Sequence, residues 1–228
     1  MHPRAHNVLS YGGAVGALLL GLVSPAVTGG EVTHNRVAVI LWVVHFVRRC
    51  AKTLWLFEFG GDDVPAADCA QEYAYYWGFA AAIAAALASP DSVPTSPTQT
   101  AVGVALWCAA EAANHTCHRT LARRAASKGA DGRKTCVPAG ERFLFSRVAC
   151  PHYTFEVSSW FAFAVVANGA RSACAFATVG AILMSSWALQ RHEQYAAASA
   201  DYWRYVRNLI VPGLNVPLPR ALTDALAR

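Results

Sequence analysis

The sequence predicts an all-α protein, a multi-pass membrane helical bundle of about six transmembrane helices with a cytosolic basic loop and C-terminal tail. Three observations support this fold class. Of 228 residues, 55% are hydrophobic and only 14% are charged, whereas about 25% of residues are charged in an ordinary soluble domain. Several apolar runs approach the roughly 20 residues that a helix needs to cross hydrocarbon. Most positive charge gathers between these runs. We expect one membrane domain over 1–228.

The first apolar run covers residues 8–27 and follows a short polar start with one arginine. A cleaved signal peptide has a similar pattern. Because other long runs follow, we predict a retained helix. Gly12, Gly13 and Gly16 do not form a dinucleotide-binding fingerprint, since no strand precedes them and their spacing differs. We expect them to serve close helix packing instead.

The second run, residues 37–59, contains Arg48, Arg49 and Lys52. Three cations within one span are costly in lipid. We therefore expect that this helix either ends near Phe46 or lines a polar cavity. A cluster of long basic side chains that reach the membrane interface is the alternative.

The third and fourth runs differ in their polar content. Residues 73–88 begin with aromatic side chains and continue with alanines, which favours an interfacial aromatic belt followed by close helix packing. Residues 100–121 become polar in their second half. Glu111, Asn114 and His118 fall on one face of a helix. A polar stripe of this kind requires a polar partner inside the membrane.

The basic loop, residues 119–142, has seven Lys and Arg side chains against two acidic ones. The fifth run lies within 143–167, the sixth covers 170–189, and an amphipathic basic tail follows. With six spans, the basic loop and the tail lie on the same side as the N-terminus, and the uncharged loop 89–98 lies opposite. The positive-inside rule then places both termini and the basic loop in the cytosol.

Two explanations fit the charge of this loop. The planar guanidinium group of arginine can donate two parallel hydrogen bonds to phosphate oxygens. The loop could therefore bind a ligand with several phosphates, such as NADPH or coenzyme A. It could equally be a topology determinant that contacts only anionic lipid. The net charge of +5 gives no reason to expect nucleic acid as a partner.

Titratable side chains stand at the head of the fifth run, in the stretch VACPHYTFEVSSWFAF at residues 148–163. His152, Tyr153 and Glu156 are costly to desolvate there, so we expect them to face a cavity or a partner. The stretch resembles the CPNYTYEVGSW-type signature of the trans-2-enoyl-CoA reductases, within the wider steroid 5α-reductase-like group of membrane reductases. His152 stands where those proteins carry Asn.

Other segments carry the same resemblance. HFVRR at residues 45–49 and YYWGFAA at 75–81 are similar to reductase segments, and Asn114 and His118 match an N-x-x-x-H pair. The tail resembles the group's H-x-x-Y and D-Y motifs. It also resembles the ending of the isoprenylcysteine and phospholipid methyltransferases, so the tail alone does not discriminate between the two classes.

The resemblance extends over about 8–212 and implies a single membrane reductase domain. Such a domain uses NADPH to reduce the trans-2,3 double bond of a very-long-chain enoyl-CoA in fatty acid elongation. Tyr153 would then donate the proton, and Glu156 and His152 would orient Tyr153 or the nicotinamide amide. The residues expected to bind the cofactor are Asn114, His118, Arg123, Arg133, His192, Tyr195, Tyr202 and Arg207.

The resemblance also implies an endoplasmic reticulum membrane protein with the enoyl-CoA substrate, membrane lipid and other fatty acid elongase subunits as partners. We expect no metal, because the cluster of His115, Cys117 and His118 lacks further histidine boxes. The alternatives are a membrane methyltransferase, a related reductase of a sterol or polyprenol, and an inactive elongase subunit. The last is included because larger reductases of this group carry an N-terminal ubiquitin-like portion that this sequence does not contain.

Overall fold

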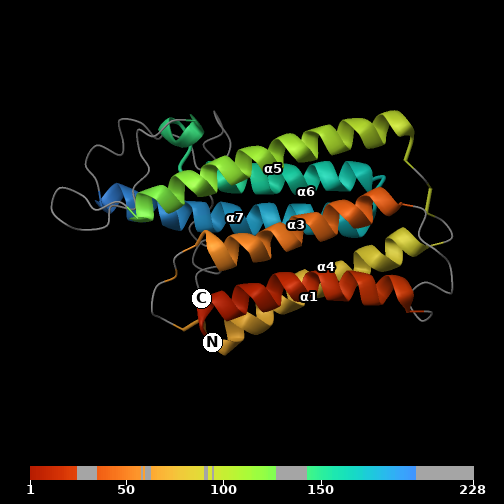
Figure 1. Ribbon diagram of the computed structural model, residues 1–228, viewed down its shortest axis with the longest axis horizontal. Coiled ribbons are helices and arrows are strands. Elements are labelled where there is room, and N and C mark those ends of the chain that lie inside the picture. The colour runs from red at the N-terminus through yellow and green to blue at the C-terminus, as the bar shows by residue number, and fades with distance from the viewer. Residues whose placement is uncertain are drawn as a thin grey trace. The chain divides into compact units, whose positions relative to one another are not determined.

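The computed structural model describes residues 1–24, 35–57, 59, 63–89, 92–93, 95–126 and 143–198. In this part of the chain all regular elements are helical, which confirms the all-α prediction (Figure 1). The elements are α1 (Pro3–Val23), α3 (Arg36–Trp55), α4 (Ala66–Ala88), α5 (Pro97–Ala126), the 3-10 helix η1 (Phe143–Ser146), α6 (Pro151–Val166) and α7 (Arg171–Ala198).

The α-helices coincide with the apolar runs, and local sequence explains several of their starts. Pro3 and Pro151 are the first residues of α1 and α6, a position where proline's fixed φ suits a helix and its missing N–H is not needed. The side chain of Asn35 accepts a hydrogen bond from the amide of Ala38 at 3.0 Å and so caps α3.

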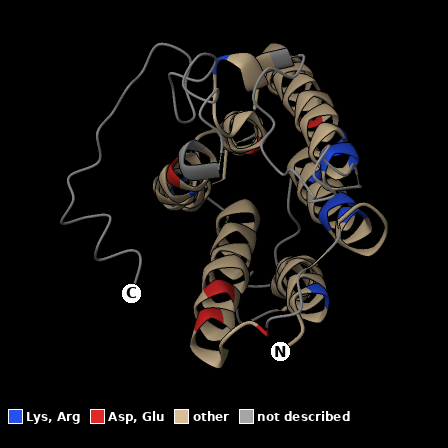
Figure 2. Ribbon diagram, turned by 90° about the vertical axis from the view of Figure 1, so that its left-hand side faces the viewer, with Lys and Arg blue, Asp and Glu red and all other residues tan. Residues whose placement is uncertain are grey.

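Two helical segments, Pro3–Val23 and Arg171–Tyr195, are long and apolar enough to cross a membrane. Most of the helical ribbon in Figure 2 is tan, because few residues of the described helices are charged. The last helix is longer than its apolar run predicts. The run ends at residue 189, but α7 continues to Ala198, since the following Gln, Arg, Glu and Ala residues are good helix formers.

The cations of the second run lie on a continuous helix. The alternative in which this helix ends near Phe46 is therefore wrong, because α3 extends to Trp55. Lys52 is only 3% exposed. The Nη2 of Arg49 donates a hydrogen bond to the hydroxyl of Tyr11 at 2.6 Å, and the guanidinium carbon lies 4.7 Å from the centre of the Tyr11 ring. A polar and aromatic partner on α1 thus offsets part of the desolvation of Arg49.

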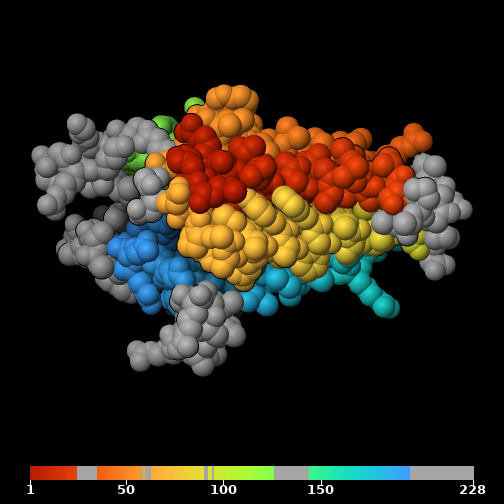
Figure 3. Space-filling view, turned by 90° about the horizontal axis from the view of Figure 1, so that it is seen from below, coloured from red at the N-terminus to blue at the C-terminus, as the bar shows by residue number. Residues whose placement is uncertain are grey.

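The chain divides into two compact units, and the first comprises Met1–Trp107 and Trp160–Ala177. In this unit α1 packs along α4 and α3, and Figure 3 shows α1 (red) beside α4 (orange to yellow). Aromatic rings form the core. The ring of Phe176 lies 5.1 Å from Trp42 and 4.9 Å from Trp160, and that of Trp42 lies 4.7 Å from Phe46.

The second unit comprises Cys108–Ser159 and Thr178–Arg228. Its described helical parts are the second half of α5, η1, the first half of α6 and most of α7. All site residues predicted from the sequence belong to this unit.

Candidate active site

The amide of Asn114 links α5 to the first turns of α6. Its Nδ2 donates one hydrogen bond to Oε2 of Glu156 and another to the backbone carbonyl of His152, both at 2.8 Å. Asn114 is 0% exposed and Glu156 is 2% exposed. A buried carboxyl group needs such a donor, because loss of hydration is otherwise uncompensated. The pair therefore fixes the start of α6 against α5.

Aromatic and imidazole rings surround this hydrogen-bonded pair. The ring centres of His118 and His152 are 5.3 Å apart, and those of His152 and Tyr153 are 4.2 Å apart. On the other side, the Tyr153 ring lies 6.3 Å from that of Trp187 on α7. Three helices of the second unit thus contribute to one cluster around Tyr153, which is half-buried.

The polar stripe predicted for the fourth run is buried. Glu111, Asn114 and His118 are 6%, 0% and 7% exposed, whereas the neighbouring His115 is exposed. Spacing of three and four residues places the first three on one face of α5, and this face meets α6. The prediction that the stripe needs a polar partner is confirmed by the bonds of Asn114.

The predicted site residues have different places in the structure. Five of them lie in the cluster: Asn114, His118, His152, Tyr153 and Glu156. Arg123 is exposed near the end of α5, where its Nε donates to the carbonyl of Arg119 at 3.3 Å. His192 is half-buried and Tyr195 is 8% exposed, one and two turns beyond Trp187 on α7. The other three predicted residues, Arg133, Tyr202 and Arg207, lie outside the described part of the chain.

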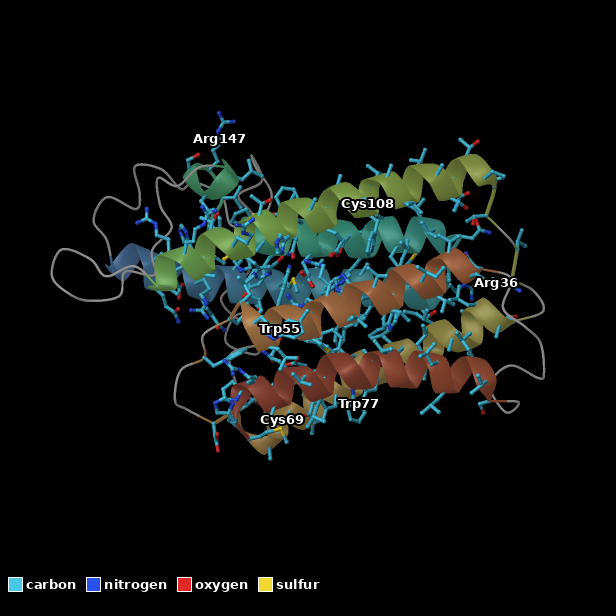
Figure 4. All side chains as sticks on the ribbon, in the orientation of Figure 1. Arg36, Trp55, Cys69, Trp77, Cys108 and Arg147 are labelled. Carbon is cyan, nitrogen blue, oxygen red and sulfur yellow. The ribbon has the colours of Figure 1, made fainter. Side chains whose placement is uncertain are left out.

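Sequence reasoning missed Trp187 and left Glu111 out of the site. Trp187 stands inside an apolar run, where an aromatic residue gives no signal of its own. Glu111 was recognised only as part of the stripe. A stronger signal for Glu111 was available, because an acidic residue within an apolar span is costly and commonly functional. Charged groups also flank the cluster in sequence, among them Arg147, which is exposed just after η1 and labelled in Figure 4.

Cys150 precedes α6 and is 0% exposed. Burial raises the pKa of its thiol to about 12, opposed in part by the nearby Arg191 guanidinium. An unfolded thiol ionises near pH 8.5. Because the folded pKa is the higher one, the stability contributed by this thiol is present below about pH 8.5 and is lost as the pH rises toward 12.

We therefore expect iodoacetamide to leave Cys150 of the folded protein almost unmodified at pH 8.5, since the thiolate is the nucleophile. The measurement is mass spectrometry of the peptide that contains Cys150. The same peptide should be alkylated at least about tenfold faster after denaturation, because a thiol with a pKa of about 8.5 is then half ionised. Equal rates in the two states would contradict the burial of this thiol.

Helices rich in apolar residues, two of them long enough to cross a membrane, and a buried cluster of titratable side chains at one helix start define a helical protein that holds a polar site. The sequence matches the family described as 3-oxo-5-alpha-steroid 4-dehydrogenase over residues 63–215. This match covers more than half of the chain and includes the whole described cluster. The protein belongs to this family.

Similar curated proteins carry the names of enoyl-CoA reductases, which confirms the resemblance stated above. The "Very-long-chain enoyl-CoA reductase" of Dictyostelium discoideum is 29% identical over 79% of this chain and 58% of its own length. The "Probable very-long-chain enoyl-CoA reductase art-1" of Caenorhabditis elegans is 32% identical over 78% of this chain and 58% of its own length. The human "Trans-2,3-enoyl-CoA reductase-like" protein is 27% identical over 81% of this chain and 53% of its own length. The chain thus spans little more than half the length of these relatives.

Proposed function

We propose that this protein uses NADPH to reduce the trans-2,3 double bond of a very-long-chain enoyl-CoA, and that residues 8–212 form one membrane reductase domain. Membership of the steroid dehydrogenase family and the names of the relatives support this proposal. The observation that carries it is the buried bridge from Asn114 to Glu156 and to the His152 carbonyl, which fixes the backbone that presents Tyr153.

The donor set of the cluster suits a nicotinamide nucleotide. Imidazole and phenol rings can stack on a planar ring, and amide and imidazole groups can hydrogen-bond a carboxamide. We assign the nicotinamide end to Asn114 and His118. Arg123 and Arg133 supply the positive charge that phosphates require. His192, Tyr195, Tyr202 and Arg207 complete the proposed set. Bound NADPH would supply a hydride to the β-carbon of the substrate.

Tyr153 acts in this proposal as the general acid. Addition of hydride to the β-carbon leaves an enolate on the thioester, and a proton must reach the α-carbon. A phenol with a pKa near 10 is a suitable donor to such a strong base. The ring contact at 4.2 Å lets His152 limit the orientation of Tyr153. Glu156, held by Asn114, orients either the phenol or the nicotinamide amide.

The proposed setting is the endoplasmic reticulum membrane, with six spans and with both termini and the basic loop in the cytosol. The coincidence of the α-helices with the apolar runs supports six spans, and the charge of the loops supports the orientation. Membrane lipid and other elongase subunits are proposed partners. A soluble, highly charged coenzyme A moiety and NADPH would then approach from the cytosolic side.

A direct assay tests this function. The purified protein should oxidise NADPH only when a long-chain trans-2-enoyl-CoA is present, with the saturated acyl-CoA as product. NADPH at 100 times its dissociation constant should add about 2.7 kcal/mol to stability, which corresponds to roughly 5–10 °C in Tm for a chain of this size. S-adenosylmethionine should produce no shift. Stabilisation by S-adenosylmethionine alone would support a methyltransferase, and reduction of a 3-oxo-4-ene steroid alone would contradict the proposed substrate.

A further inference from the structure

A cavity of about 730 Å³ lies in the first unit, at the end where α4 finishes and α7 begins. Its volume is within the range of small-molecule sites, roughly 300–1,000 Å³. The proposed reduction uses none of its residues. It is lined by the end of α4 (Ala82, Ala86, Ser89), by Ser92 and Val93, by the α6–α7 turn (Ala167, Asn168, Ala170) and by Arg171 and Ser172 at the start of α7.

The N-cap residue of α7 provides no side-chain hydrogen bond to the first turn. Ala170 is the N-cap residue, since its carbonyl accepts the amide of Cys174 at 3.0 Å, and alanine has no side-chain oxygen. The first turn contains no acidic residue. The first N–H groups of a helix have no intrahelical acceptor, and together with the positive end of the helix dipole they favour an anion at this position.

The side chains at this helix start also favour an anion. Arg171 is a cation in the first turn, where the helix dipole disfavours positive charge. Ser172 lines the same cavity, and its Oγ is buried with no hydrogen-bond partner within the described chain. A buried hydroxyl without a partner has lost its hydration without compensation. One acceptor in the cavity would offset the unfavourable position of both residues.

A helix start elsewhere in the first unit provides a contrast. Arg36 is likewise the first residue of its helix, α3, and Figure 4 labels it at the start of that helix. There the Asn35 side chain caps the helix in the ordinary way, and Arg36 is exposed and does not line the cavity. The two helices thus share an arginine at the same position but differ in the cap and in the cavity.

The walls of the cavity are held in place by hydrogen bonds. Asn168 and Gly169 adopt left-handed φ values of 53° and 69°. The Nδ2 of Asn168 donates to the carbonyl of Val93 at 2.9 Å, and its Oδ1 accepts from Gln99 at 3.3 Å. Gln99 also donates to the carbonyl of Val165 at 2.9 Å. The cavity is therefore preformed rather than assembled by its ligand.

We infer that this cavity binds a phosphate group, supplied by an anionic phospholipid headgroup or by free phosphate. Backbone N–H groups at a helix start, an arginine and a hydroxyl are the usual ligands of phosphate. The alanine side chains of α4 provide an apolar wall beside them. The cavity is much larger than a free phosphate ion requires, which favours a headgroup with its glycerol.

The test measures Tm of the purified full chain in neutral detergent with added inorganic phosphate, with short-chain phosphatidylglycerol, or with phosphatidylcholine of the same chain length. We expect phosphatidylglycerol to raise the Tm of the wild type by roughly 5 °C at saturation. Arg171→Gln should lose most of this shift, and Arg36→Gln should retain it. A shift with inorganic phosphate that also depends on Arg171 identifies free phosphate as the source.

The same experiment can overturn the inference. Equal shifts in wild type and Arg171→Gln would exclude a phosphate site at this helix start, whichever lipid is used. Without lipid, Arg171→Gln should be as stable as the wild type or more stable, because a cation is removed from the positive end of α7. If instead Arg171→Gln lowered Tm without lipid, a group of the chain itself would be the partner of Arg171. That outcome would also exclude the inference.

Discussion

Replacement of Tyr153 by phenylalanine is expected to lower kcat for enoyl-CoA reduction by about 10²–10⁴-fold, the usual contribution of a positioned general acid. The ring contacts with His152 and Trp187 do not need the hydroxyl. The Tyr153→Phe protein should therefore keep these ring contacts and fold, with its Tm lowered by no more than about 4 °C, the effect of losing one hydrogen bond. Steady-state kinetics should show the loss in kcat, with little change in KM for NADPH.

Tyr75→Phe is a matched control. Tyr75 is also half-buried, near the middle of α4, and its hydroxyl donates to the carbonyl of Phe176 at 2.9 Å in the first unit. Loss of that bond should cost about 1 kcal/mol of stability and leave kcat unchanged. If Tyr153→Phe retained wild-type kcat, the proton would come from another group, and the assignment of the general acid would be wrong.

Asn114→Asp should be strongly destabilising and should abolish activity. The substitution removes two hydrogen-bond donors and places a second carboxyl group at the 2.8 Å contact with Glu156. Two buried carboxyl groups at this distance repel each other unless one takes up a proton. We expect a loss of about 3–5 kcal/mol, the usual cost of an uncompensated buried charge. Thermal unfolding measures this loss, and it should be smaller at pH 5 than at pH 8, since protonation of one carboxyl relieves the repulsion.

A compensating change tests whether the contact itself is responsible. In Asn114→Asp combined with Glu156→Gln, the donor and the acceptor exchange places, and Tm should recover in part. Recovery should be incomplete, because aspartate cannot donate to the His152 carbonyl that Asn114 reaches at 2.8 Å. Additive losses in the double variant would show that the two side chains do not interact in the folded protein.

Hydropathy predicted the helices well because each apolar run must satisfy its own backbone hydrogen bonds in lipid. Hydropathy was less reliable for the second run, where three cations interrupt the apolar residues. Cations suggested that the second run could end near Phe46, yet α3 continues to Trp55, and Tyr11 on another helix accepts a hydrogen bond from Arg49. A partner that is distant in sequence cannot be read from the run itself.

The candidate site was predictable where residues share one helix face or one motif. The stripe on α5 and the motif at the start of α6 are local patterns, and the structure joins them through Asn114. The contact between Tyr153 and Trp187 depends instead on packing between α6 and α7. No spacing rule connects residues 34 positions apart on different helices, so that contact required the structure.

Packing at Gly13 limits how the pair α1 and α4 can evolve. A Cβ atom at position 13 would lie 2.1 Å from Nε1 of Trp77, the indole nitrogen that donates to the Ser10 carbonyl at 3.1 Å. Any side chain at position 13 would displace the indole and break that bond. A side chain at position 13 alone should therefore destabilise the packing of α1 on α4, and the two positions should covary, with a larger residue at 13 accompanied by a smaller one at 77.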